Sequence, residues 1–165
     1  MKIMCESQRK KIRTYIKNNL DISDLIKDYS IKNEDLSGAI ISKFNRCKDN
    51  MSGVNLSNCI IGKRGTVNNI SGSNLKYSRW CNAEIKGILF MRKCNCRNAD
   101  FSKAILNNLE YQNTDFTDGK FCGACIRIGT DGGWGAKFSS DFFKDLAKGW
   151  SVKVLSKSKE ELENE

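Results

Sequence analysis

Large apolar residues recur at every fifth position through the middle of the chain, usually with a small residue two positions earlier and a polar residue in between. Consecutive examples are Ala99–Lys103, Ala104–Asn108, Leu109–Asn113 and Thr114–Asp118. A period of five fits neither an α-helix, which repeats every 3.6 residues, nor a β-strand, which alternates every two. Repeats of this kind predict a coil that stacks on further copies of itself.

The five-residue period extends over residues 34–128 with only two slips of one residue. If the large residue is taken as the centre of each block, 19 successive centres follow, of which 16 are large and apolar. These predicted centres are Leu36, Ile41, Arg46, Met51, Leu56, Ile61, Thr66, Ile70, Leu75, Trp80, Ile85, Phe90, Asn95, Phe101, Leu106, Tyr111, Phe116, Phe121 and Ile126. Such a long register predicts one repetitive domain with a narrow, filled core.

The blocks resemble the pentapeptide-repeat family, whose loose motif is A(D/N)LXX. The best matches are Val54–Leu56, Ser73–Leu75, Ala99–Phe101 and Thr114–Phe116. The resemblance implies an all-β solenoid, a right-handed quadrilateral β-helix in which four blocks make one turn. The central residue and the small residue two before it would point into the core. With four blocks to a turn, the 19 blocks make about five coils, and the flanking segments are expected to add short capping helices at both ends.

Three segments are expected to interrupt the regular coils, at 43–48, 62–69 and 94–96. Arg46 and Thr66 occupy central positions, and an unpaired arginine cannot be buried, so local bulges or loops are predicted there. Lys63–Thr66 is typical of a protruding loop, and Asn95 lies at the second slip. Trp80 is large for the interior, so its coil is either distorted or turns Trp80 outward.

The sequence divides into an N-terminal helical cap at 1–30, the β-helix at 31–128, and a C-terminal part at 129–165. Two short amphipathic helices are predicted in the first part, the second of them capped by Asp21 or Ser23. Their apolar positions are Ile12, Tyr15, Ile16 and Leu20, then Ile22, Leu25, Ile26 and Tyr29. These helices would cover the open edge of the first coil.

The C-terminal part reads as a glycine-rich hinge, a helix and a charged tail. Phe142, Phe143, Leu146 and Trp150 follow helical spacing. This helix is either a simple lid or a lid that also pairs two chains into a homodimer. Both interpretations stay open at the level of the sequence.

Positive charge is the main clue to function. The chain has 28 basic and 19 acidic residues, a net charge of +9, and residues 63–97 contain only Glu84 as an acid. The basic residues of this stretch, here called the basic belt, are Lys63, Arg64, Lys76, Arg79, Lys86, Arg92, Lys93 and Arg97. The belt favours either solubility alone or an acidic partner, nucleic acid or an acidic protein surface. Tyr77 and Trp80 lie among these cations and could stack on bases if exposed.

Enzymatic, metal and membrane functions have no support in the sequence. There is no histidine to act as a general base near neutral pH, and the two close cysteine pairs, Cys94/Cys96 and Cys122/Cys125, lie too far apart to share a zinc ion. Gly129–Lys137 lacks the spacing of a phosphate-binding loop. No metal, no cofactor and no catalytic residue is therefore predicted. Eight cysteines without a regular framework, no apolar run that spans a bilayer and no secretory signal indicate a cytoplasmic protein with reduced thiols.

The resemblance adds a second hypothesis. Its better-known members bind type II topoisomerases, DNA gyrase above all, as acidic rods that resemble B-form DNA. Mimicry of DNA requires dense negative charge along the rod, whereas this chain has a net positive charge. The leading hypothesis is therefore a non-enzymatic interaction module that binds an acidic macromolecule through the basic belt. The alternative is a gyrase-directed rod that acts through the projecting loop and a dimer.

Overall fold

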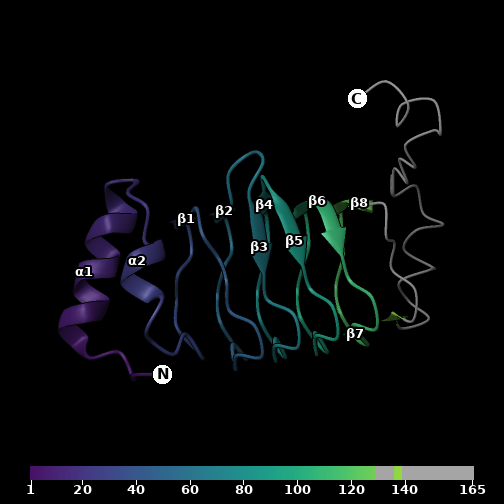
Figure 1. Ribbon diagram of the computed structural model, residues 1–165, viewed down its shortest axis with the longest axis horizontal. Helices are drawn as coiled ribbons and strands as arrows, with labels where there is room; N and C mark the ends of the chain where they lie inside the picture. The colour runs from purple at the N-terminus through teal and green to yellow at the C-terminus, as the bar shows by residue number, and fades with distance from the viewer. Residues whose placement is uncertain (129–135, 139–165) are drawn as a thin grey trace.

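The structure, a computed structural model, describes residues 1–128 and 136–138 and is a β-solenoid (Figure 1). Helices α1 (Glu6–Lys17) and α2 (Ser23–Ile26) cover one end of a stack of coils. The strands are β1 (Ile40–Ile41), β2 (Ile60–Ile61), β3 (Val67–Asn69), β4 (Glu84–Ile85), β5 (Ile88–Phe90), β6 (Ile105–Glu110), β7 (Asp115–Phe116), β8 (Cys125–Ile128) and β9 (Lys137–Phe138). Every strand pairing is parallel, so the predicted all-β solenoid is confirmed.

The ladder of strands β1, β2, β4, β6 and β8 shows how successive turns stack. Ile41 pairs with Ile61, Ile61 with Ile85, Ile85 with Leu106, and Leu106 with Ile126. Each pairing joins positions one turn apart, so the chain makes four complete turns between Ile41 and Ile126. The sequence led us to expect about five coils, and a further part-turn does precede Ile41.

Four ladders of buried residues form the core, one on each side of the coil. Backbone hydrogen bonds and strand pairing give their members in order. Ladder A stacks Ile31, Met51, Leu75, Cys96 and Phe116; ladder B stacks Leu36, Leu56, Trp80, Phe101 and Phe121; ladder C stacks Ile41, Ile61, Ile85, Leu106 and Ile126; ladder D stacks Arg46, Ile70, Met91 and Tyr111. The outer surface over each ladder is called face A, B, C or D below.

The first interruption lies where the sequence placed it. Ile70 follows Ile61 by nine positions where a regular block takes five, and the surplus forms a loop at 62–66 that projects between β2 and β3 (Figure 1). Thr66 belongs to this loop, and its hydroxyl donates to the Lys63 carbonyl at 2.7 Å. The predicted loop at Lys63–Thr66 is thus confirmed, and Thr66 is not a core position.

The second interruption lies earlier than predicted. The extra residue falls between Ile85 and Met91, where β5 buries Leu89 and leaves Phe90 only half-buried. Met91 and Cys96 are the true centres, so Phe90 and Asn95 were wrongly assigned and the repeat does not break at 94–96. The position of this slip was predicted wrongly because Phe90 and Met91 are both large and apolar, so either residue fits the central position of the repeat.

Trp80 is fully buried in ladder B, so of the two predicted alternatives, a distorted coil or an outward Trp80, the outward orientation is wrong. Its ring stacks on Phe101 with centroids 5.7 Å apart, and Phe44 meets it edge-on at 6.3 Å. Its indole N–H donates to the Ser78 hydroxyl at 2.9 Å, which satisfies the single polar group of the ring. Because Ser78, the small residue two positions earlier, is so short, the narrow coil holds the indole without bulging.

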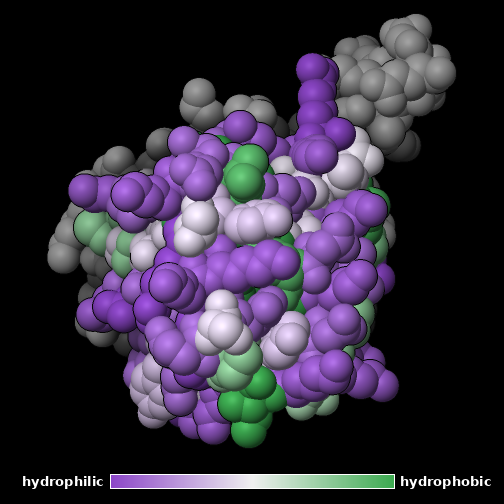
Figure 2. Space-filling view, turned by 90° about the vertical axis from the view of Figure 1, so that its left-hand side faces the viewer, coloured by the Kyte–Doolittle hydropathy of each residue, from purple (hydrophilic) through white to green (hydrophobic). Residues whose placement is uncertain are grey.

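The N-terminal helices cover the first turn as predicted. Ile12 of α1 and Ile26 of α2 are buried against the solenoid. The first helix ends at Lys17, so Leu20 is 48% exposed and does not belong to its buried side. The Asp21 carboxylate accepts a hydrogen bond from the Ser23 N–H at 2.9 Å at the start of α2. Seen from this end, the molecule is mostly hydrophilic, as expected for a cap (Figure 2).

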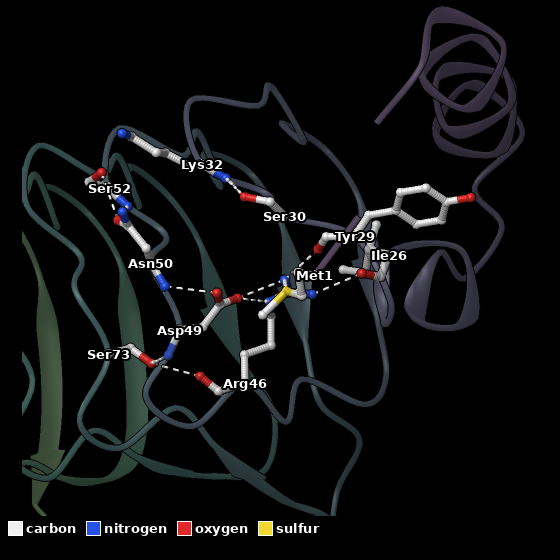
Figure 3. Close-up of polar contacts among 10 residues, drawn as sticks. All are labelled: Met1, Ile26, Tyr29, Ser30, Lys32, Arg46, Asp49, Asn50, Ser52 and Ser73. Atoms are coloured by element: carbon white, nitrogen blue, oxygen red, sulfur yellow. Dashed lines mark hydrogen bonds and ion pairs between the residues drawn. The ribbon is translucent and has the colours of Figure 1, made fainter. Parts of the chain in front are cut away.

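Arg46 joins this cap to the first turn (Figure 3). Its guanidinium pairs with the Asp49 carboxylate at 2.7 Å and donates to the carbonyls of Ile26 at 2.9 Å and Tyr29 at 2.6 Å. Both charged side chains are almost fully buried. The prediction that 43–48 bulges to keep Arg46 out of the core is wrong, because Arg46 has partners that neutralise and hydrogen-bond it.

The predicted C-terminal helix with Phe142, Phe143, Leu146 and Trp150 lies outside the described residues, as does most of the predicted hinge. The two interpretations of that helix, lid or homodimer contact, stay predictions.

Candidate interaction surface

The basic belt does not form one continuous surface on the solenoid. The register places Lys76, Arg92, Lys93 and Arg97 along the two edges of face A. The remaining four lie elsewhere: Arg79 on face B, and Lys63, Arg64 and Lys86 at the corner between faces C and D. Face A therefore collects half of the predicted binding residues.

The floor of face A is a ladder of asparagines. Asn50 bridges to Asn74, and Asn74 bridges to Asn95, one per turn. Each side-chain carbonyl accepts a hydrogen bond from the backbone N–H two residues later, at 3.2 Å for Asn74 to Lys76 and 3.3 Å for Asn95 to Arg97. These local bonds are typical of asparagine at turns. They fix the corner that carries the two cations, so the uncharged floor and the charged edge form one rigid unit.

Two further lysines border the same face, and the sequence analysis missed both. Lys32 occupies the corner position that Lys76 and Arg97 occupy in later turns. Lys48 lies on the opposite edge, in the same corner column as Lys93. The belt was defined from residue 63 onwards, where acids are scarce. Counting along the coil from the centres Ile31 and Arg46 would have found these two lysines.

Corner residues on these edges have positive φ, and at three of these corners the residue is a lysine or tyrosine. Lys48, Tyr77 and Lys93 have φ values of 56°, 60° and 56°. The same corner position elsewhere is mostly Asn or Gly, which reach positive φ at lower cost. Lys103, at the corner between faces B and C, also holds this conformation with a φ of 59°. The exposed Tyr77 ring also lies against the Lys76 ammonium, 5.6 Å from its Nζ.

Carboxylates neutralise part of the basic belt. Arg92 forms an ion pair with the mostly buried Glu110, and Arg97 lies 3.7 Å from Asp115. Within residues 1–128 and 136–138, Lys32, Lys48, Lys76 and Lys93 have no such ion pair, and we call them the face A lysines. They carry the free positive charge of this surface.

Acidic groups end the basic stretch at the fourth turn. Partial burial works to raise the pKa of Asp115, but hydrogen bonds from the Thr117 hydroxyl and N–H outweigh it, so the pKa lies below its usual value. Asp115 is therefore charged at neutral pH. The basic part of face A extends over the turns from Lys32 to Arg97.

Trp80 cannot belong to any stacking surface, because its side chain has no exposed area. Of the two aromatic residues predicted to stack on bases, only Tyr77 is exposed, at 62%. Tyr77 lies at the edge of face A, so the structure brings the surviving aromatic together with the face A lysines.

Buried cysteines of this chain are structural. The Cys59 thiol donates to the Leu36 carbonyl at 3.0 Å, and the Cys94 thiol donates to that of Ile70 at 3.1 Å. Burial raises the pKa of Cys59 to about 12 and that of Cys94 to about 11. Among the described residues no three metal-ligating side chains converge, and no helix there is long and apolar enough to cross a membrane.

These environments predict a labelling order for the eight thiols. Cys5, Cys47 and Cys122 are exposed, and a hydrogen bond from Ser7 lowers the pKa of Cys5. A maleimide at neutral pH is expected to modify these three first, because the thiolate is the reactive form. Cys59, Cys94 and Cys96 should react only after denaturation, as followed by mass spectrometry. Equal labelling rates for Cys59 and Cys5 in the folded protein would contradict the buried positions.

Comparisons with known proteins identify the repeat. Residues 91–127 match the model of pentapeptide repeats with eight copies. A search of curated proteins gave no match. Among solved structures, a pentapeptide repeat protein from the Arabidopsis thaliana thylakoid lumen is 14% identical, with 78% of this chain and 81% of that one covered and a TM-score of 0.31.

A second solved structure is full-length QnrB1, a plasmid-mediated fluoroquinolone resistance protein. It is 16% identical, with 69% of this chain and 64% of that one covered and a TM-score of 0.22. The family match lies within a longer stack of five-residue blocks from Ile31 to Ile126, and it identifies residues 91–127 as pentapeptide repeats.

Proposed function

We propose that this protein is a non-enzymatic interaction module in which face A binds an acidic macromolecule, with nucleic acid as its first partner. The observation that carries the proposal is the set of Lys48, Tyr77 and Lys93. All three hold a left-handed conformation around an uncharged asparagine floor. Asn or Gly would make these corners more cheaply, so the cationic and aromatic side chains favour a role at the surface.

The dimensions of face A suit a polyanion. Successive turns lie about 4.8 Å apart, so the three steps from Lys32 to Arg97 cover about 14 Å. Across the face, the four steps from Gly72 to Lys76 cover about 13 Å of extended chain. A charged backbone can therefore lie between two rows of cations, while Tyr77 offers a ring on which a base can stack. The free cysteines support a reducing, cytoplasmic location for this activity.

The test is binding to duplex DNA, single-stranded DNA and structured RNA across a salt series. In one variant, Lys48 and Lys93 become Asn, which suits positive φ, and Lys32 and Lys76 become Gln. We expect binding at least about tenfold weaker at low salt, and a salt slope reduced by about one for each lysine removed. Tyr77→Asn should weaken single-strand binding most, because it removes only the ring.

A matched control removes four cations elsewhere. Changing Lys43, Lys63, Arg64 and Lys86 to Gln lowers the net charge equally but leaves face A intact. Binding should persist in this control. If both variants lose affinity equally, net charge and not face A drives binding. If the wild-type protein binds none of the three nucleic acids at low salt, an acidic protein surface becomes the partner to test.

The alternative function is a topoisomerase- or gyrase-directed rod that acts through its projecting loop. The observation that favours it is the loop itself, whose residues Lys63 and Arg64 are both exposed. Deleting 63–66 leaves five residues from Ile61 to the next centre, which is the regular spacing, so the solenoid should keep its register. A loop-driven interaction would be lost in this deletion, whereas binding through face A would be retained.

A further inference from the structure

Face C has mostly apolar outward residues, with Glu84 as the one charged residue among them, unlike faces A and B. The outward residues of β1, β2, β4, β6 and β8 stack in register over ladder C as Ile40, Ile60, Glu84, Ile105 and Cys125. The equivalent outward positions on face A are Asn50, Asn74, Asn95 and Asp115, and those on face B are Asp35, Asn55, Arg79, Asp100 and Lys120. The solenoid thus accepts polar residues at this position, and Ile105 is nevertheless 43% exposed.

One side of this apolar stripe is strongly basic. Lys43, Lys63, Arg64 and Lys86 all lie at the corner between faces C and D, and we call this corner the face C edge. Lys86 lies 3.7 Å from Glu84, while the other three have no carboxylate ion pair among the described residues. The corner between faces B and C is mostly uncharged, with Ser57, Asn58, Cys81 and Asn82 in its middle turns.

The projecting loop holds part of the face C edge in a fixed place. The Lys63 N–H donates to the Thr66 hydroxyl at 2.9 Å, and the Thr66 N–H donates to the Lys63 carbonyl at 3.0 Å. The loop then rests on Gly87, where an added Cβ would come within 2.3 Å of the Thr66 carbonyl oxygen. A glycine is therefore required below the loop, and Lys63 and Arg64 project from a braced platform.

The spacing of the stripe matches an α-helix that lies along the solenoid axis. Rungs of the stripe repeat about every 4.8 Å, and a helix advances about 5.4 Å per turn. Over the four steps from Ile40 to Cys125 the mismatch adds up to only about 2.4 Å. A helix with one apolar residue per turn can thus contact Ile60 and Ile105 together, and it crosses Glu84, whose carboxylate lies 3.7 Å from the Lys86 ammonium, on the rung between them. Acidic residues on one flank of that helix would face Lys63 and Arg64.

We propose that face C binds a partner protein through an amphipathic helix that has an apolar stripe and an acidic flank. Ile60 and Ile105 contact the apolar stripe, and Lys63 and Arg64 on the face C edge pair with the acidic flank. Helix-in-groove recognition uses the same kind of anchors at one-turn spacing. This site is separate from face A and does not depend on the polyanion hypothesis.

The test uses two synthetic 18-residue helical peptides and fluorescence anisotropy. Both carry Leu once per turn; the first has Glu along one flank, and the second has Lys there. The wild-type protein should bind the Glu peptide and bind the Lys peptide at least about tenfold more weakly. Ile60→Asn with Ile105→Asn should cost about tenfold or more in affinity, because Asn fits the same outward position on face A. The face A variant should bind like the wild type.

A charge reversal makes the test specific. Lys63→Glu with Arg64→Glu should reverse the preference in favour of the Lys peptide. The proposal is wrong if the wild type binds neither peptide, binds both equally, or is indifferent to the two Asn substitutions. It is also wrong if sedimentation shows a dimer that becomes monomeric in the Asn variant, because a second copy would then occupy face C.

Discussion

Replacing Arg46 by Ile is expected to lower the free energy of unfolding by about 3–5 kcal/mol, because Asp49 would remain buried without its partner. The Asp49 side chain is only 6% exposed, and Arg46 is its ion-pair partner. The substitution also strips hydrogen bonds from the carbonyls of Ile26 and Tyr29, which lie in the N-terminal cap. Urea unfolding followed by circular dichroism measures the loss.

A double variant separates the two effects of Arg46. Arg46→Ile with Asp49→Ser copies the next turn, in which Ile70 and Ser73 occupy the same two positions. Removing both charges should recover much of the lost stability, since a buried ion pair can often be replaced by apolar residues of suitable size. The remaining deficit then reports the unpaired cap carbonyls. A loss below about 1 kcal/mol in the single variant would show that Asp49 reaches water, contrary to the buried geometry.

Replacing Trp80 by Ala should lower the free energy of unfolding by about 3–5 kcal/mol, the usual cost of truncating a buried large aromatic residue. The indole has no exposed area and contacts both Phe44 and Phe101. Trp80 lies in the middle of ladder B, and each turn is stabilised only by its neighbours, so the cavity weakens both halves of the stack. Thermal and denaturant unfolding of the variant provide the measurement.

Trp80→Leu is the matched control for this cavity. Leu56 holds the same position one turn earlier, so Leu is compatible with the local backbone and leaves a smaller void. We expect a loss clearly below that of Trp80→Ala, because the cost rises with residual cavity volume. Equal losses in the two variants would argue that the hydrogen bond to Ser78, and not the volume of the ring, dominates.

The sequence predicted the fold well because the narrow coil constrains two positions out of every five. Small and large residues must alternate in the interior, so the pattern survives even where single blocks depart from it. The loop at Lys63–Thr66 was found for the same reason, since it adds four residues to one turn. The slip before Met91 was misplaced because Phe90 and Met91 satisfy the pattern equally, and only the strand β5 decides between them.

The candidate surfaces were only partly predictable. Charge along the chain pointed to residues 63–97, but the coil distributes them over several corners, so neighbours in sequence separate and distant residues meet. Lys32 and Lys93 border one face although 60 positions lie between them. The burial of Arg46 could not be predicted from the sequence either. Two of its partners are backbone carbonyls of the cap, which no residue type reveals.

The projecting loop between Ile61 and Ile70 shows where the sequence of such a protein can change without disturbing its core. Ile85 still stacks on Ile61 after four surplus residues, so length added at a corner leaves the interior untouched. A corner can therefore take up extra length where its backbone conformation allows, while the inward positions remain constrained by packing. A rod built in this way separates the part that must be inherited intact from the part that can acquire new partners.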